Sequence, residues 1–270
     1  MVFLFHFFPC FICYYSNFYL VTSEHTVETP LYKGALERAV NAITGQELWT
    51  ISGYTGEFGA MSYAIADGYC NYFNGLDNQI YTLGRGPSTT TVTASPKVSP
   101  FGDNVVVEGS VTDISAGTNQ NQQAADFPNG VPCSSDASMK DWMGYVYQQK
   151  PLPTNFTGVP VSINVIDSNG NYRNIGTATT DANGKFSYVY TPQVPGKYTV
   201  IANFAGTNGY WPSSSQNAIS VSEAPAATSQ PTPTPASMAD LYFLPLSVGL
   251  IIAIVVIGAL LAVLILRKRP

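Results

Sequence analysis

Charged side chains are scarce in this chain of 270 residues. Lys and Arg together number 12 and Asp and Glu number 17, so charged residues make up 11% of the sequence and the net charge is −5. Three of the positive charges are consecutive, at Arg267, Lys268 and Arg269. A protein that binds nucleic acid needs a basic surface that neutralises phosphates. The charge balance therefore excludes nucleic acid as a partner.

Residues that commonly carry catalysis or bind metal ions are also few. The chain has two histidines, His6 and His25, and four cysteines. Neither histidine has a nearby serine or cysteine in the arrangement of a nucleophilic triad. Cys10 and Cys13 have the spacing of half a zinc site, but no second pair of ligands lies nearby and the surrounding sequence is apolar. We therefore predict no catalytic residue, no cofactor and no metal ligand.

Two other patterns each have a functional and a structural interpretation. Cys70 and Cys133 could form a disulfide in an oxidising compartment, although their wide separation makes two separate thiols an equal alternative. The stretch from Asp167 to Asn171 carries the polar side chains of a calcium-binding loop, but it lacks the sixth-position glycine and the terminal glutamate of an EF-hand. A hairpin turn is the favoured interpretation of that stretch.

Glycine, proline and tyrosine are abundant where charge is not. The sequence has 23 Gly, 19 Pro and 17 Tyr, a composition typical of short strands joined by turns and uncharged loops. We therefore predict an all-β protein with one or two compact domains.

The C-terminal segment is a predicted transmembrane helix. Residues 246–266 read LSVGLIIAIVVIGALLAVLIL without a charge, and at about 1.5 Å per residue they span roughly the 30 Å of a hydrocarbon core. We predict the helix over residues 241–266, with the lipid bilayer as its partner. By the positive-inside rule, the basic tail of residues 267–270 is cytoplasmic and the chain before Asp240 lies outside the cell membrane.

A proline-rich segment, residues 223–240, precedes this helix. Prolines at positions 225, 231, 233 and 235 alternate with Thr, Ala and Ser. Such a sequence favours extended polyproline II and cannot form a packed core. We therefore predict a stalk, and a stalk followed by a single span is typical of a protein displayed on the cell surface.

The apolar N-terminal segment, residues 1–16, allows two interpretations. A signal peptide is the first, and Val21-x-Ser23 would serve as its cleavage site, but no Lys or Arg precedes Lys33. The second is that residues 17–23 form a strand of the domain that follows, which leaves residues 1–16 as a misassigned start. We favour the second interpretation because of the motif in the next segment, and it would place the export signal upstream.

A strand, a tight turn and a second strand are predicted around Thr44 and Gly45, where the glycine suits a positive φ. The segment from Ala39 to Trp49 resembles the repeat of pyrroloquinoline-quinone-like (PQQ-like) β-propellers, A-x-D-x-x-T-G-x-x-x-W. The matching residues are Ala39, Thr44, Gly45 and Trp49, with Asn41 in place of the Asp. In that family the motif is structural, so the resemblance implies packing between blades and no catalytic role.

Residues 17–86 provide somewhat under two such blades, with further turns predicted at Asp67-Gly68 and Asp77-Asn78. Propellers close with four to eight blades, so we expect this chain to be the C-terminal part of a larger propeller protein. Dehydrogenases of the family bind their cofactor with residues from many blades. A fragment of such a quinoprotein oxidoreductase, with its cofactor site in missing upstream blades, is therefore the alternative function.

Residues 87–222 contain regularly spaced alternating strands and are predicted to form an Ig-like β-sandwich. The segment after Thr179 is similar to the Ig-like modules of bacterial and archaeal surface proteins, which serve as spacers or adhesive units. The residues that carry this similarity are Thr180, Asp181, Gly184, Phe186, Pro192, Gly196, Tyr198 and Tyr210.

An insertion at residues 119–157 is predicted to contain a short helix near residues 136–149, capped by Ser135 or Asp136. Met139, Trp142, Met143 and Val146 follow the spacing of one apolar helical face. This face either packs on the sandwich, which we favour, or binds a partner. Asn155 begins the sequon Asn-Phe-Thr and is the candidate for N-glycosylation.

The whole chain after residue 17 resembles archaeal membrane-anchored surface proteins that combine PQQ-like repeats, an Ig-like module, a Pro/Thr-rich stalk and a C-terminal span. The resemblance implies a non-enzymatic interaction or structural role in the cell envelope, with an envelope protein or a glycan as the possible partner. Carbohydrate binding is a further alternative, because exposed Tyr and Trp side chains suit sugars.

Overall fold

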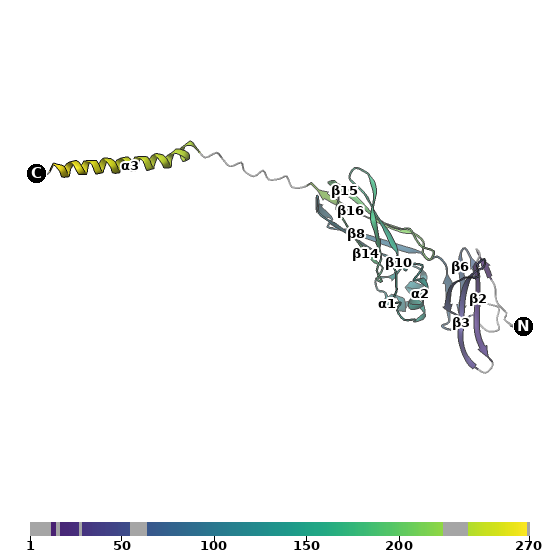
Figure 1. Cartoon of the computed structure of the whole chain (residues 1–270). Helices are drawn as coiled ribbons and strands as arrows, with labels where there is room; N and C mark the ends of the chain where they lie inside the picture. Colours follow the sequence, from purple (N-terminus) through teal and green to yellow (C-terminus); the bar gives the residue numbers. More distant parts are fainter. Residues whose placement is uncertain (1–11, 15–16, 27–28, 55–63, 224–236, 269–270) are drawn as a thin grey trace. The chain divides into compact units, whose positions relative to one another are not determined.

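The structure is a computed structural model that describes residues 12–14, 17–26, 29–54, 64–223 and 237–268. It divides into two compact units, Met1–Ala224 and Pro225–Pro270 (Figure 1). Most of the predicted N-terminal segment, with His6 and Cys10, and most of the predicted stalk lie outside the described residues. Arg269 lies outside them as well.

The first unit begins with two antiparallel sheets. The first sheet has the order β1-β2-β3-β4 and the second has the order β5-β6-β7. Their strands are β1 (Ile12–Tyr14), β2 (Asn17–Thr26), β3 (Thr29–Asn41), β4 (Glu47–Ser52), β5 (Ala64–Ala66), β6 (Tyr69–Asn74) and β7 (Gln79–Leu83).

Local sequence explains the turns of these sheets. Asp67 and Gly68 both have positive φ, at 52° and 83°, so they form the two-residue turn between β5 and β6 that their sequence predicts. Gly53, just after β4, is packed so closely that a Cβ there would lie 2.3 Å from Cγ of Glu37 on β3 and 3.3 Å from the Tyr72 hydroxyl on β6. The two sheets therefore pack against each other at this point. Among the described residues, however, they do not close into a ring, so the structure does not show a propeller.

A β-sandwich follows. In one sheet β10 pairs with β8, β11 and β14, and the other sheet has the order β13-β12-β15-β16-β9, with β9 parallel to β16. The strands are β8 (Ser88–Ser95), β9 (Val98–Pro100), β10 (Val105–Asp113), β11 (Val131–Pro132), β12 (Pro160–Ile166), β13 (Tyr172–Thr179), β14 (Lys185–Tyr190), β15 (Gly196–Phe204) and β16 (Ser213–Ser222).

The sandwich core comes from alternate residues of these strands, as expected for sheets with one buried face. Val105, Val107 and Val111 of β10 are fully buried, and so are Val161, Ile163 and Val165 of β12. The Tyr198 hydroxyl on β15 donates to the Val194 carbonyl at 2.9 Å and accepts from the Val194 N–H at 3.0 Å. This is the tyrosine corner of immunoglobulin-type domains. The domain is therefore an Ig-like β-sandwich.

Side chains close both open sides of the sandwich. Between β8 and β16, the Thr90 and Ser213 hydroxyls lie 2.7 Å apart, and Asn217 donates to the Val92 carbonyl at 3.3 Å. Between β13 and β14, the Tyr188 hydroxyl donates to the Ile175 carbonyl, and its ring covers Gly176. Unpaired strand edges can pair with the strands of other chains. The side-chain bonds across these edges therefore protect the domain from aggregation by edge pairing.

The segment between β10 and β12 holds the predicted insertion. It contains a 3₁₀ helix η1 (Ala116–Asn119), α1 (Asn121–Asp126), β11 and α2 (Met139–Gln148). Helix α2 begins later than predicted, and its N-cap residue, Ser138, makes no side-chain capping bond. The prediction that Ser135 or Asp136 caps the helix is wrong, because the Asp136 carboxylate instead accepts from the N–H groups of Asn208 and Gly209, at 3.1 Å each.

The apolar face of α2 packs inward, as the favoured interpretation requires. Trp142 is 1% exposed, and its indole N–H donates to the Pro132 carbonyl at 3.0 Å. Met139 and Met143 pack against the main core of the sandwich. The alternative, in which Trp142 contacts a partner, is contradicted because the side chain is already enclosed.

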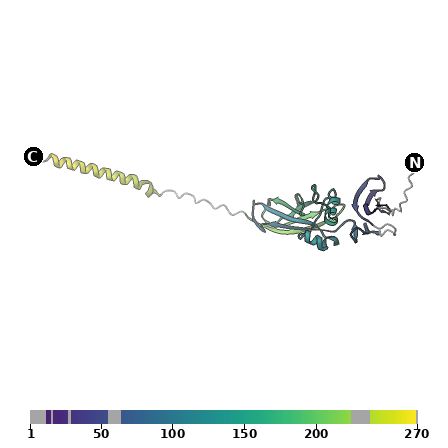
Figure 2. The same cartoon turned by 90° about the horizontal axis from the view of Figure 1, so that it is seen from below.

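The second unit is a single helix, α3 (Met238–Arg267), visible in Figures 1 and 2. Its segment Leu241–Arg267 has 27 residues, of which only Arg267 is charged, and none of its most apolar part is buried among the described residues. It is long enough and apolar enough to cross a membrane.

Candidate functional site beside the inserted helix

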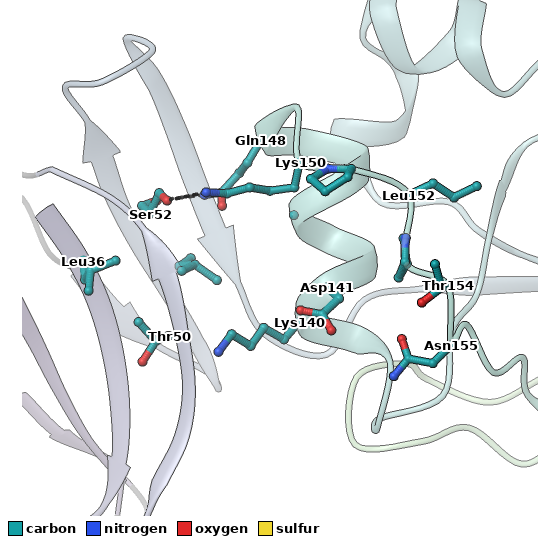
Figure 3. A pocket seen from close by; sticks show the side chains of 14 residues that line it. Leu36, Thr50, Ser52, Lys140, Asp141, Gln148, Lys150, Leu152, Thr154 and Asn155 are labelled. Carbon is teal, nitrogen blue, oxygen red and sulfur yellow. Dashed lines mark hydrogen bonds between the residues drawn. The ribbon is translucent and has the colours of Figure 1, made fainter. Parts of the chain in front are cut away.

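A cleft of about 670 Å³ surrounds the exposed face of α2. Its volume falls within the roughly 300–1,000 Å³ of small-ligand sites. Figure 3 shows α2 running between β4 on one side and the loop of residues 150–155 on the other. Leu36, Thr50, Ile51 and Ser52 line the first side, and the helix contributes Lys140, Asp141, Gly144 and Gln148.

The end of α2 is attached to β4. Gln149 adopts a left-handed conformation with φ of 53°, which ends the helix, and the Lys150 N–H returns to the Gly144 carbonyl at 3.1 Å. The Gln148 side-chain amide donates to the Ser52 carbonyl at 2.8 Å, and the Lys150 ammonium donates to the Ser52 hydroxyl at 3.2 Å. Both bonds end on Ser52, the last residue of β4, at the exposed edge of that strand. They therefore fix the distance between β4 and the end of α2.

The charges of the cleft are not paired with each other. The ion pairs found among the described residues join Arg38 to Glu47 and Arg173 to Asp167. Lys140, Lys150 and Asp141 belong to neither pair, and all three are exposed. The pKa of Glu47 is lowered by a hydrogen bond from the Thr50 side chain, then by the Arg38 charge and then by the Lys140 charge. The cleft therefore offers two cationic donors and one anionic acceptor to a ligand.

Asn155 lies on the loop side of the cleft, and its side chain points toward α2 (Figure 3). The backbone on either side of it is held by the Ser138 hydroxyl, which donates to the Asn155 carbonyl at 3.5 Å and accepts from the Thr157 N–H at 2.9 Å. The Phe156 ring packs on Trp142 with centroids 4.6 Å apart. The sequon is thus exposed but held by its neighbours. The motif alone could not indicate this location, because it depends on the tertiary contact with Trp142.

A junction between β7 and β8 fixes the N-terminal sheets to the sandwich. The Tyr69 hydroxyl donates to the Arg85 carbonyl at 2.9 Å, and Nε of Arg85 donates to the Tyr210 carbonyl at 2.8 Å. The Arg85 guanidinium also lies 4.4 Å from the ring centroid of Trp211, a cation–π contact. Sequence reasoning missed this junction, whose partners are more than 120 residues apart. It matters for the cleft because the cleft walls come from both regions.

The motif residues of the N-terminal region form the turn between β3 and β4. The Asn41 side-chain oxygen accepts from the N–H groups of Ile43 and Thr44 at 2.9 Å each, and Gly45 has a φ of 72°. Ala39 is fully buried and is paired in register with Trp49. Asn41 provides the same carbonyl acceptor as an Asp would, so the turn tolerates this departure from the pattern.

Glu37 is the most strongly perturbed carboxyl of the N-terminal sheets. It is 2% exposed, and burial raises its pKa from 4.5 to about 8. Burial, and next the Glu37 charge, also raise the pKa of the Cys70 thiol to about 11. Cys133 is fully buried in the sandwich, and burial raises its thiol pKa too. Both cysteines are free, so the disulfide alternative is not realised, and thiols of raised pKa are poor nucleophiles.

The Asp167 stretch forms a turn, as favoured. One oxygen of its carboxylate accepts from the N–H groups of Asn169 and Asn171 at 2.9 Å each, and the other accepts from the Asn171 amide at 3.1 Å. These hydrogen bonds, foremost those from Asn171, lower the pKa of Asp167. Within the described part of the chain, no group of three or more His, Cys, Asp or Glu side chains could hold a metal ion.

At the C-terminus, Arg267 is the last residue of α3, and the Lys268 N–H donates to the Ile265 carbonyl at 3.3 Å. Both follow the apolar segment directly, at the place where the sequence predicts a membrane boundary.

No family model and no curated protein matches this chain. Among solved structures, it is similar to the fibronectin(III)-like modules of CbhA from Clostridium thermocellum, with 10% identity over 77% of this chain and 87% of that chain, and a TM-score of 0.29. Because this TM-score is low, the Ig-like assignment stands on the strand order and on the tyrosine corner.

Proposed function

We propose that this protein is anchored in the cell membrane by α3 and has a non-catalytic interaction or structural role on the cell surface. The observation that carries the proposal is the helical segment Leu241–Arg267, whose 27 residues are long enough and apolar enough to cross a membrane. Exposing so much apolar surface to water is unfavourable, whereas a bilayer accommodates it. The Ig-like sandwich, with both sides closed by side chains, suits a spacer or a display module.

In this proposal the chain before Asp240 is outside the membrane, residues 223–240 are a stalk and residues 267–270 are cytoplasmic. Residues 87–222 are the Ig-like domain, and residues 17–86 are sheets of the PQQ-like propeller type. The turn at Asn41 and the pairing of Ala39 with Trp49 support that type. We further propose a relationship to archaeal surface proteins, on the sequence resemblance alone.

The chemistry of the described residues supports a non-catalytic role. The two thiols are buried and have raised pKa values, and the cleft beside α2 is lined without histidine or cysteine. The alternative of a quinoprotein fragment places the cofactor site in upstream blades, so the described residues of this chain supply no argument for it.

The test uses the full chain with a C-terminal epitope in intact cells. An external protease should remove the sandwich and leave the epitope protected until the cells are permeabilised. The epitope fragment should also stay in the membrane after alkaline extraction. Release by alkali would overturn the anchor, and protection of the sandwich on intact cells would overturn its placement outside.

A further inference from the structure

The geometry points to a glycan on Asn155 as the occupant of the cleft beside α2. This inference rests on the proposed export of the sandwich, because a glycan of this kind is added on the outer side of a membrane. The inference extends the proposed function by assigning the cleft to a carbohydrate that this chain itself carries. The sugar would cover Lys140 and Asp141.

The first step is the direction of the attachment site. The Asn155 side chain extends from its loop toward α2 (Figure 3), and within the described residues it has no hydrogen-bond partner of its own. The Ser138 bonds at the Asn155 carbonyl and the Thr157 N–H hold the backbone on both sides. Packing of Phe156 on Trp142 prevents the loop from turning over. A sugar on Asn155 is therefore aimed along the cleft and not into solvent.

The second step is the chemistry of the lining. Sugar hydroxyls both donate and accept hydrogen bonds, so they need a mixed set of partners. Lys140 is a donor, and Lys150 keeps N–H groups beyond the one that it donates to Ser52. The Asp141 carboxylate and the Gln148 side-chain carbonyl are acceptors, while one Gln148 amide N–H is donated to Ser52. Leu152, which is 57% exposed, adds an apolar surface for the C–H groups of a sugar ring. The unpaired charges of the cleft are thereby provided with partners.

The covalent step needs a co-reactant, a saccharide carried on a lipid phosphate, and a membrane transferase. The amide nitrogen of Asn155 forms a bond to C1 of the sugar, and the bond from C1 to the phosphate oxygen breaks. The lipid phosphate leaves with the bonding electrons, and one amide proton passes to a base. The hydroxyl of Thr157 completes the acceptor sequence.

The test labels lysines on intact cells that make the full chain, using an amine-acylating reagent that does not cross membranes. The rate at Lys140 is divided by the rate at Lys197, an exposed lysine of β15 that is not part of the cleft. The compared variants are Thr157→Ala, which removes the sequon, and Thr157→Ser, which keeps it. Glycopeptide mass spectrometry reports occupancy at Asn155 in the same samples.

We expect a glycan on Asn155 in the native chain and in Thr157→Ser. In these two proteins the relative labelling rate of Lys140 should be at least about threefold lower than in Thr157→Ala, which is equivalent to roughly 0.6 kcal/mol of protection. An unmodified Asn155, or a modified Asn155 with equal Lys140 rates in all three proteins, would overturn the inference. In either case, labelling of Lys197 on intact cells still supports the proposed function. If Lys197 is labelled only after permeabilisation, the proposed function itself has failed.

Discussion

The N-terminal sheets and the Ig-like sandwich show two ways of building β-structure from the same scarcity of charge. The sandwich encloses one continuous cluster of nineteen buried residues, nearly all of them aliphatic or aromatic. Among the residues of β1 to β7 whose burial is described, the buried apolar ones are Ala35, Ala39, Cys70 and Tyr72, and the Glu37 carboxyl is buried as well. The sandwich therefore has the continuous apolar core of an independent domain, whereas the described interior of the sheets includes an ionisable group.

Ile163→Ala is the strongest test of this difference. It removes a fully buried side chain from the centre of the sandwich, so we expect the free energy of unfolding to fall by about 4 kcal/mol. Ile80→Ala is the control from the N-terminal sheets. Its side chain is 75% exposed, and the expected change is within about 0.5 kcal/mol. Urea unfolding monitored by circular dichroism measures both, and equal effects would remove the contrast between the two regions.

Glu37→Gln tests the buried acid. Because the pKa of Glu37 is raised from 4.5 to about 8 in the folded state, its contribution is fully favourable below pH 4.5 and is lost as the pH rises through 8. At about 1.4 kcal/mol per pH unit, the loss at pH 7 is about 3 kcal/mol. Hydrogen exchange of β3 between pH 5 and pH 8, corrected for the intrinsic rate, should show this loss in the native chain and not in the variant. A pH-independent native chain would mean that Glu37 is solvated.

Asp136→Ala tests the connection between the insertion and the loop after β15. The variant leaves the N–H groups of Asn208 and Gly209 without their acceptor, and we expect a loss of about 1.5 kcal/mol. Asp103→Ala removes an exposed carboxylate that makes no side-chain bond with the residues that the structure describes, so it controls for the change in charge. Thermal unfolding compares the two, and equal shifts would show that Asp136 acts only through its charge.

Asn41→Ala tests the turn of the repeat motif and has the smallest expected effect. Losing the acceptor for Ile43 and Thr44 should cost about 1 kcal/mol, and Asn41→Asp, which keeps an oxygen in place, should cost little. The loss should appear as faster hydrogen exchange in β3 and β4 only. Equal exchange in both variants would mean that the side chain does not hold the turn.

Patterns within one element were predictable from the sequence, and contacts between elements were not. The alternation in β10 and β12 indicates the buried faces, and the apolar spacing of α2 indicates which side packs inward. The role of Asp136 was predicted wrongly. A carboxylate just before a helix is typical of an N-cap, but the hydrogen-bond partners of Asp136 are Asn208 and Gly209, some seventy residues later. The cleft, the direction of Asn155 and the stacking of Arg85 on Trp211 all depend on such distant neighbours. No local pattern could indicate them.

The bonds between β8 and β16 have a mechanical consequence. The two strands run in the same direction, since Thr90 meets Ser213 and Val92 meets Asn217. With α3 as the proposed anchor, a force on the N-terminal sheets would enter the sandwich at the start of β8 and leave it at the end of β16. Such a force would load all the side-chain hydrogen bonds between β8 and β16 at the same time, in shear, instead of breaking them one after another. Resistance to force depends on the unfolding rate, so side-chain bonds loaded in shear would give the sandwich a high unfolding barrier under the pull that the proposed anchor would exert.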